Sequence, residues 1–197
     1  LAVALGRWVR RRALAVRSTW PPSPHRLIRP PVHVNVSGSE LRARDFVDQI
    51  DRDLDELGVR PDQLALEVRE LDLHRVEART AVADLHHLGV QVLVDGAGEG
   101  GLALGELAHL PVAGIKLPPQ LVRGLDRDDT GIEVVRSLVL LAHGVGWRSL
   151  AVGVETDHQR SVLFGFGVDA VQGRAVIMPV DADAFSAWLA ARAEPDR

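Results

Sequence analysis

The stretch from residue 64 to residue 101, LALEVRELDLHRVEARTAVADLHHLGVQVLVDGAGEGG, decides the fold of this chain. It opens with an apolar segment, LALEV, at residues 64–68. A second apolar segment, VQVLVD, follows at residues 90–95, before the glycine-rich end of the stretch. The residues between them, 75–88, have helical periodicity and end before Gly89, a residue type that commonly terminates helices. Two short apolar strands joined by a helix predict a parallel pair that is covered on at least one face.

The same alternation continues outward in both directions along the 197 residues. We predict six βα units, with a proline-rich loop at 18–31 before the first strand. The predicted strands are 32–36, 64–68, 90–95, 114–117, 149–154 and 170–172. The predicted helices are 1–16, a helix from a cap at Ser37 or Ser39 to Gly58, 75–88, 102–110, 129–144, 157–167, and 183–193 with Asp181 or Asp183 as its cap.

This order of elements predicts an α/β fold, a class in which a doubly wound sheet and a (β/α)₈ barrel both fit. A complete barrel usually needs roughly 250 residues. Six units in 197 residues therefore predict an incomplete (β/α)₈ TIM-type barrel with about six βα units. We expect one domain over residues 1–197 that lacks the first strands of the barrel.

Composition narrows the class of protein. The net charge of −4 disfavours a protein that binds nucleic-acid polymers. No apolar run reaches the roughly 18 residues that a membrane-spanning helix requires. The absence of cysteine excludes disulfides and thiolate metal sites and fits a cytoplasmic location. Apolar residues 1–5 precede arginines, the reverse of a signal peptide, so we expect the start to be the tail of a helix in a longer chain.

Polar side chains interrupt the apolar strands at or near their carboxyl ends. In a parallel barrel those ends share one rim, where the chemistry takes place. Oxygens of Asn, Asp and Glu suit Mg²⁺ or Mn²⁺, and a lysine beside carboxylates can orient a water or stabilise an anionic phosphate. The set predicts metal-assisted phosphoester hydrolysis, against the alternative that charged residues simply mark where strands reach solvent. Its members are Asn35, Glu67, Asp95, Lys116, Glu155 and Gln172.

Six short motifs, taken in order, resemble those of EAL domains. The first three are VNVS at 34–37, similar to VNLS, LEVRE at 66–70, similar to LELTE, and DGAGEG at 95–100, similar to DDFGTG. The others are IKL at 115–117, similar to the KID segment, VGVET at 152–156, similar to EGVET, and VQG at 171–173 with the later Pro179, similar to the closing QG…P motif.

The resemblance implies a (β/α)₈ barrel that hydrolyses cyclic di-GMP with two divalent cations. It also implies a role for each matching residue of this chain. The implied metal ligands are Asn35, Glu67 and Asp95, the implied catalytic residues are Lys116, Glu155 and Gln172, and the implied residue that steadies the loop after position 95 is Glu70.

Several positions depart from the EAL pattern. Gly96 stands where the resemblance implies a second aspartate, a ligand to the second cation, and Val152 stands where it implies a glutamate. The loop and lysine motifs also differ, at Ala97, Glu99 and Pro118. The EAL motif and its companion arginine would lie before Leu1. We therefore expect one Mg²⁺ or Mn²⁺ site at most.

These departures favour a catalytically impaired EAL-like domain, a sensor of cyclic di-GMP or an interaction module that binds a protein partner or a second copy of the chain. The first alternative is a fragment of an active, metal-dependent cyclic di-GMP phosphodiesterase. The second is a non-functional remnant or a partial gene, whose unpaired barrel edges would favour dimer closure or aggregation.

Three further patterns are interpreted as structural. Arginines at 7, 10, 11 and 12 form a solvated face of the first helix, with contact to anionic lipid or a partner as the alternative. Acidic residues at 51, 53, 55 and 56 form a solubilising helix face. The glycine-rich segment 96–101 matches neither GxxxxGK[ST] nor GxGxxG, so we do not expect it to cradle a phosphate.

Overall fold

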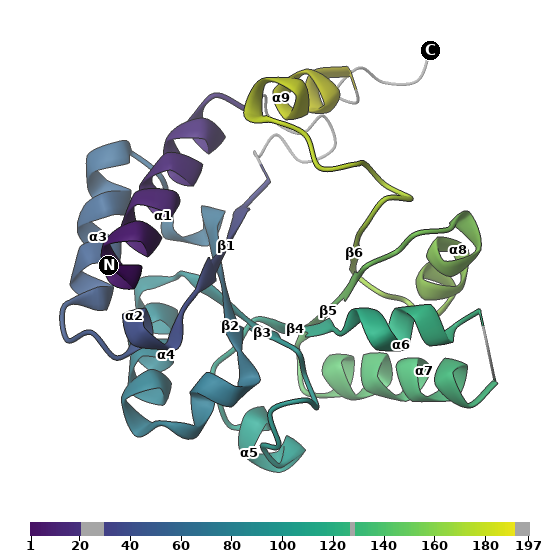
Figure 1. Cartoon of the computed structure of the whole chain (residues 1–197). Coiled ribbons are helices and arrows are strands. Elements are labelled where there is room, and N and C mark those ends of the chain that lie inside the picture. Colours follow the sequence, from purple (N-terminus) through teal and green to yellow (C-terminus); the bar gives the residue numbers. More distant parts are fainter. Residues whose placement is uncertain (21–29, 127–128, 192–197) are drawn as a thin grey trace. The chain divides into compact units, whose positions relative to one another are not determined.

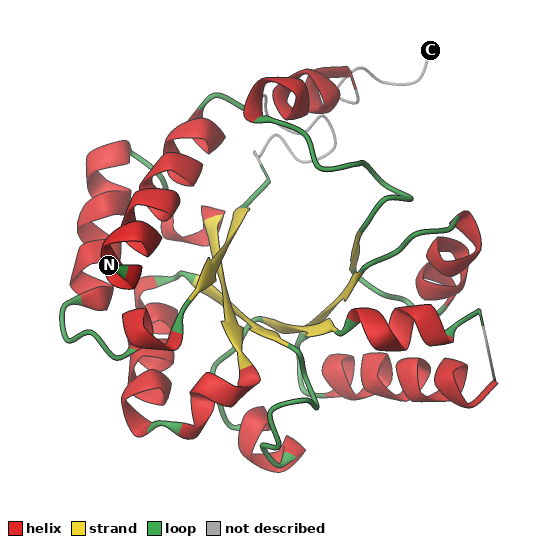
Figure 2. Ribbon diagram, in the orientation of Figure 1, coloured by secondary structure: helices red, strands yellow, loops and turns green. Residues whose placement is uncertain are grey.

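A computed structural model describes residues 1–20, 30–126 and 129–191 of the chain. Helices and strands alternate along the sequence, and hydrogen bonds order six strands as β1-β2-β3-β4-β5-β6 in one sheet (Figures 1 and 2). The chain divides into two compact units that are interleaved in sequence. Unit 1 comprises Leu1–Glu67, Arg75–Gln91 and Val180–Arg197, and unit 2 comprises Val68–His74 and Val92–Pro179.

In unit 1, helix α1 packs against strand β1 and against helices α2 and α3 (Figure 1). Strand β1 alternates, with its three valines buried and with His33 and Asn35 on the exposed face. Trp20 and Phe185 meet edge to face, with ring centroids 5.0 Å apart. The elements are α1 (Ala2–Ser18), β1 (Val32–Val36), α2 (Gly38–Leu41), α3 (Phe46–Leu57), the 3₁₀ turn η1 (Pro61–Gln63), the first part of β2 (Leu64–Arg69), α4 (Val76–Leu88) and α9 (Ala182–Ala191).

In unit 2, strands β3 to β6 pair in parallel in sequence order. Helices α6 and α7 pack against each other and against β5. Helix α8 begins at a capping box, in which Thr156 and Gln159 satisfy each other's backbone N–H groups. The elements are η2 (Glu70–His74), β3 (Gln91–Asp95), α5 (Leu104–Ala108), β4 (Gly114–Leu117), α6 (Pro119–Gly124), α7 (Asp129–Gly144), β5 (Arg148–Val152), α8 (Asp157–Gly165) and β6 (Ala170–Gln172).

The predicted α/β class and the six strands are confirmed. Strands β1, β4 and β6 and helix α7 have the predicted bounds. Helix α4 ends at Leu88, as predicted, and is followed by Gly89, whose φ of +90° suits a helix C-cap. Strand β5 ends at Val152, two residues earlier than predicted. Of the predicted proline-rich loop at 18–31, residues 21–29 lie outside the described residues, and Ser18 is the last residue of α1.

The single helix predicted from the Ser37 or Ser39 cap to Gly58 is wrong. The structure has two helices there, because α2 ends at Leu41 and α3 begins at Phe46. On one continuous helix, residues 41 and 46 would point about 140° apart. Leu41 and Phe46 are both 2% exposed, so a turn between the two helices is what buries both side chains.

Helix α6 was not among the helices predicted from the sequence. Proline is well tolerated at the first positions of a helix, where its missing N–H has no intrahelical partner. Pro118 is the N-cap of α6, and Pro119 is its first residue. The two prolines therefore start this helix rather than prevent it.

The interpretation of the arginines at 7–12 and the acidic residues at 51–56 as solvated helix faces is wrong for Arg10 and Asp53, which are buried. Arg10 is 1% exposed and Asp53 is not exposed at all. The Arg10 guanidinium lies 3.5 Å from Asp53 and 3.5 Å from Glu40, and it stacks over the Phe46 ring. Arg7 and Arg11 also bind Asp53. Because α1 packs beside α3, the inward members of both sets form one buried ionic cluster.

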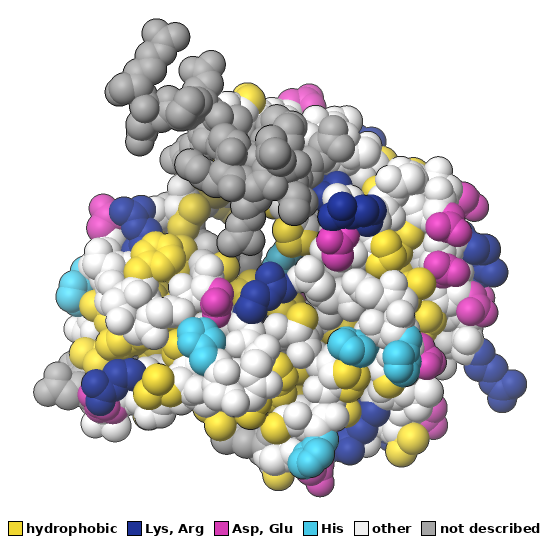
Figure 3. All heavy atoms as spheres, turned by 180° about the vertical axis from the view of Figure 1, so that it is seen from behind, with side chains coloured by type: hydrophobic (Ala, Val, Ile, Leu, Met, Phe, Trp, Pro, Cys, Tyr) yellow, Lys and Arg dark blue, Asp and Glu magenta, His cyan; other side chains and the backbone are white. Residues whose placement is uncertain are grey.

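The surface is mixed in character. On the face drawn in Figure 3, acidic and basic side chains are interspersed rather than gathered into a patch of one sign. Within the part of the chain that the structure describes, no helix is both long and apolar enough to cross a bilayer.

Candidate functional site

In unit 1, the predicted site residues Asn35 and Glu67 lie on neighbouring strands. Asn35 is the penultimate residue of β1 and is exposed, while Glu67 lies two residues before the end of β2 and is 5% exposed. The Glu67 carboxylate oxygen Oε1 is 3.1 Å from Nδ1 of His33. Since the carboxylate has only acceptor atoms, the proton of this hydrogen bond belongs to His33 Nδ1.

In unit 2, the structure brings Asp95 and Lys116 together. Val94 pairs with Ile115 in the parallel register of β3 and β4, so the next residue on each strand is Asp95 and Lys116. The Lys116 ammonium nitrogen lies 3.6 Å from Asp95 Oδ1. Lys116 is 6% exposed, and a buried ammonium requires such a carboxylate partner. The pair presents both signs of charge at the end of the strands.

Glu70 holds the loop that follows β3. This residue is 2% exposed and opens η2, directly after β2. Its carboxylate accepts hydrogen bonds from the backbone N–H of Gly98 and, at 2.8 Å, from that of Leu102. His74, at the end of η2, donates through Nε2 to the carbonyl oxygen of Gly100 at 2.7 Å. The loop is therefore fastened to η2 at three backbone positions.

Position 96 combines a backbone constraint with a neighbouring carboxylate. Gly96 has φ of +71°, a region that costs other residues roughly 1–2 kcal/mol. A Cβ atom placed on Gly96 would lie 2.9 Å from Oε2 of Glu99. Thus the space beside position 96, where the family resemblance implies an aspartate side chain, contains the carboxylate of Glu99. A cavity of about 250 Å³ opens here, lined by Arg69, Glu70, Leu71, Asp95, Gly96, Glu99 and Gly100.

Glu155 and Gln172 belong to the region of β5 and β6, the last two strands of unit 2. Glu155 is exposed, three residues beyond the end of β5, and its backbone N–H donates to Gln159 Oε1 at 2.8 Å. Gln172 ends β6 and is exposed, and its carbonyl accepts the N–H of Val154. Val152 is in register with Gln172. An apolar side chain therefore neighbours Gln172 where the resemblance implies a carboxylate.

Two residues beside the predicted set were missed by sequence reasoning. His33 precedes Asn35 by two positions, and strand alternation alone would have placed both on one face. Glu99 gave no signal of this kind, because its approach to position 96 depends on the path of the loop. Among the residues that the structure describes, no group of three or more His, Asp or Glu side chains is arranged to hold a metal ion, a count that leaves out the Asn35 amide.

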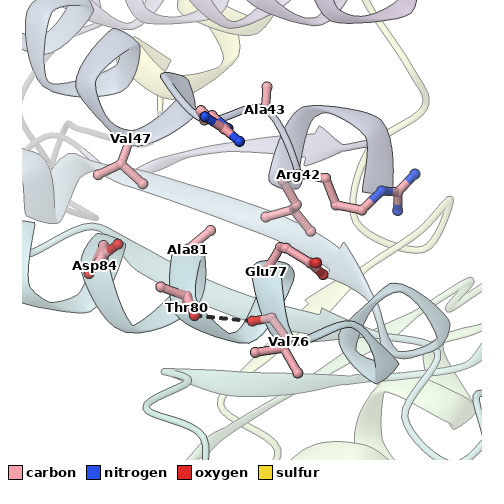
Figure 4. A pocket seen from close by; sticks show the side chains of 10 residues that line it. Arg42, Ala43, Val47, Val76, Glu77, Thr80, Ala81 and Asp84 are labelled. Atoms are coloured by element: carbon pink, nitrogen blue, oxygen red, sulfur yellow. Dashed lines mark hydrogen bonds between the residues drawn. The ribbon is translucent and has the colours of Figure 1, made fainter.

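A second cavity, of about 280 Å³, lies in unit 1 between the turn that joins α2 to α3 and helix α4 (Figure 4). Arg42 lies on the turn side, and Glu77 and Asp84 project from α4. Thr80 Oγ1 donates to the Val76 carbonyl at 3.1 Å, which is an ordinary contact within a helix. None of the predicted site residues lines this cavity, so the candidate site remains at the strand ends.

Comparisons with known proteins identify the family of this chain. The family model described as EAL domain matches residues 1–179. The crystal structure of the EAL domain of Mycobacterium smegmatis DcpA is 31% identical, with a TM-score of 0.88, and the match covers 99% of this chain and 88% of that one. Because EAL domains resemble each other in fold, this similarity confirms the predicted TIM-type barrel class.

Two further relatives carry names that describe ligands or activity. Escherichia coli cyclic di-GMP phosphodiesterase PdeR is 28% identical over 95% of this chain and 28% of its own length. The manganese and cyclic di-GMP complex of Klebsiella pneumoniae BlrP1 is 25% identical, with a TM-score of 0.75, over 87% of this chain and 43% of that one. The chain spans about a third or less of the length of the first curated relatives that it matches.

Proposed function

The chain belongs to the EAL domain family, and from this premise we propose that it is a cyclic di-GMP-binding domain with impaired hydrolysis, acting as a sensor or interaction module. The observation that carries the proposal is the glycine at position 96. A glycine with φ of +71° offers no side-chain ligand where the family resemblance implies a second aspartate. Val152 beside Gln172 removes a second carboxylate. Two-cation hydrolysis needs both ions, so these losses impair the reaction more than binding.

The residue types of the implied ligands suit one divalent cation. Asn35, Glu67 and Asp95 would hold Mg²⁺ or Mn²⁺ through an amide oxygen and carboxylates, the hard ligands that these ions prefer. Two observations favour this assignment: Glu67 is kept in place by His33, and Asp95 keeps its carboxylate beside Lys116. When bound, the cation would polarise a phosphodiester oxygen and acidify a water.

The remaining site residues would act on the ligand directly. Lys116 is fixed by Asp95 at 3.6 Å, so its charge stays at the strand ends, where it would stabilise a phosphate oxygen or orient a water. Gln172 and Glu155 are both exposed and would contribute polar contacts from the ends of β6 and β5. Glu70 would keep the loop after Asp95 in the ligand-bound conformation through its two backbone hydrogen bonds.

We propose that residues 1–197 form a single EAL-like domain and that it lies in the cytoplasm. One family match runs through both compact units, which supports a single domain. A protein partner or a second copy of the chain is the proposed target of an interaction module. The alternative function is an active phosphodiesterase. Glu99 favours it, because its carboxylate occupies the space beside position 96.

The experiment measures cyclic di-GMP binding by calorimetry with Mn²⁺, together with turnover of the nucleotide. We expect binding without turnover, and we expect Asp95→Asn to weaken binding at least about tenfold, roughly 1.4 kcal/mol. Asp51→Asn is the matched control, because Asp51 is an exposed carboxylate on α3. Turnover comparable to that of intact EAL phosphodiesterases would reject impairment. The absence of both binding and turnover would leave only the interaction role.

A further inference from the structure

His33 contacts a proposed metal ligand without being part of the predicted site. Its ring nitrogen Nδ1 lies 3.1 Å from Glu67 Oε1, across the neighbouring strands β1 and β2. The His33 side chain is 32% exposed, whereas that of Glu67 is 6% exposed. The imidazole therefore reaches from an accessible strand face to a carboxylate that is almost completely buried.

The direction of this hydrogen bond determines which carboxylate oxygen is held. Nδ1 must donate, because a carboxylate has no proton to give. The bond holds Oε1 and restricts rotation of the carboxylate group, so it limits the directions in which Glu67 can present its oxygens to a cation. Hydrogen bonds of this kind from outer residues orient ligating carboxylates in metal sites generally.

Strand alternation places His33 on the side of the sheet where the cation would be. His33 and Asn35 are the two exposed residues of β1, and residues two apart on a strand share a face. Asn35 is itself a proposed ligand. His33 thus connects the two strands that would supply Asn35 and Glu67 to the same cation.

We propose that His33 is a positioning residue, which orients the Glu67 carboxylate toward a divalent cation through its Nδ1–H. This inference rests on the proposed function, since it assumes that Glu67 binds the cation. A competing explanation is that the pair only stabilises the two strands, as cross-strand pairs commonly do. The two explanations differ in what happens to metal affinity when the donor is replaced.

The test measures Mn²⁺ affinity of the whole chain in the absence of nucleotide, by calorimetry, with melting temperature recorded for every variant. His33→Leu keeps bulk and removes the donor, and we expect it to weaken Mn²⁺ binding about 10- to 100-fold. His33→Asn places an amide N–H near the position of Nδ1, and we expect affinity within about threefold of the original, because the donor is retained. Glu67→Gln should weaken binding at least as much as His33→Leu.

His143→Leu is the matched control. His143 donates through Nε2 to Asp169 at 2.9 Å, so this variant removes a similar pair that includes no proposed ligand. We expect a lower melting temperature and unchanged Mn²⁺ affinity. If His33→Leu does not fold, the inference depends on His33→Asn, and a tenfold loss of affinity in that folded variant overturns it.

The outcomes separate the inference from the function on which it rests. Equal Mn²⁺ affinity of the original chain and His33→Leu, with a loss in Glu67→Gln, overturns the role of His33 and leaves the cation site intact. Failure of the original chain to bind Mn²⁺ refutes the proposed cation site and the inference together. Loss in His33→Leu with recovery in His33→Asn supports the inference.

Discussion

Restoring an aspartate at position 96 is the most informative perturbation of this molecule. Gly96→Asp returns the carboxylate that the EAL pattern implies, but the structure gives it two obstacles. The backbone φ of +71° is unfavourable to a side chain. The new Cβ would also lie 2.9 Å from Oε2 of Glu99, which must move aside. We therefore expect Gly96→Asp to destabilise the metal-free chain, and we expect shortening Glu99 to recover only the part of this loss that comes from its carboxylate.

The two obstacles have different magnitudes. The backbone conformation costs roughly 1–2 kcal/mol for a residue other than glycine. Two carboxylates ~4 Å apart repel by about 1 kcal/mol in water and more where water is excluded, and the exposure of Glu99 favours the lower value. The single variant should thus lose about 2–3 kcal/mol. Adding Glu99→Thr removes the repulsion of about 1 kcal/mol, which corresponds to roughly 2–4 °C in melting temperature for a domain of this size.

Thermal unfolding without and with Mn²⁺ measures this prediction. The matched control is Gly101→Asp, because Gly101 has φ of +77° and no atom within 4 Å of the added Cβ. It should lose only the backbone contribution, about 1–2 kcal/mol. Mn²⁺ should stabilise Gly96→Asp more than the original chain, and cyclic di-GMP turnover should rise in the double variant. A single variant as stable as the original chain, or no recovery on adding Glu99→Thr, would refute the reasoning.

Two further predictions concern Asp53 and Glu70. Asp53→Asn should cost about 3 kcal/mol in urea unfolding at pH 7, because it leaves Arg10 buried beside a weaker partner. Burial by itself raises the pKa of Asp53, but hydrogen bonds from Arg11 and Arg7 outweigh this effect and bring the pKa below its ordinary 3.8. The stabilisation from the ionised carboxylate is therefore fully present above pH 3.8, and it disappears as the pH falls through the lowered pKa. An equal cost of the substitution at about pH 2 would contradict this assignment. Glu70→Ala should speed hydrogen exchange at the Gly98 and Leu102 amides, since each loses a charge-assisted bond worth about 1.5–3 kcal/mol, whereas His74→Ala, which removes only the bond to Gly100, should leave both amides protected.

Strand and helix boundaries were predictable where one local signal was decisive. Gly114–Leu117 and Ala170–Gln172 are short, mostly apolar segments between turn residues. Asp129–Gly144 keeps the helical periodicity of its apolar residues without interruption. The split between α2 and α3 was not predictable in this way, because it depends on where Leu41 and Phe46 must both be buried. Helix α6 was not predicted, although the proline at its first position, Pro119, is a residue type that commonly begins a helix.

The sequence by itself determined the α/β class, the six strands with the polar residues near their carboxyl ends, and the EAL resemblance. These depend only on residue type and on spacing along the chain. Only the tertiary structure decided which charges meet. Arg10 with Asp53, His33 with Glu67 and Lys116 with Asp95 are each joined by packing between separate elements. The same holds at position 96: the sequence reveals the missing aspartate, but the path of the loop brings the Glu99 carboxylate into its place. Periodicity defines the face of one element, whereas a contact between two elements depends on how both of them pack.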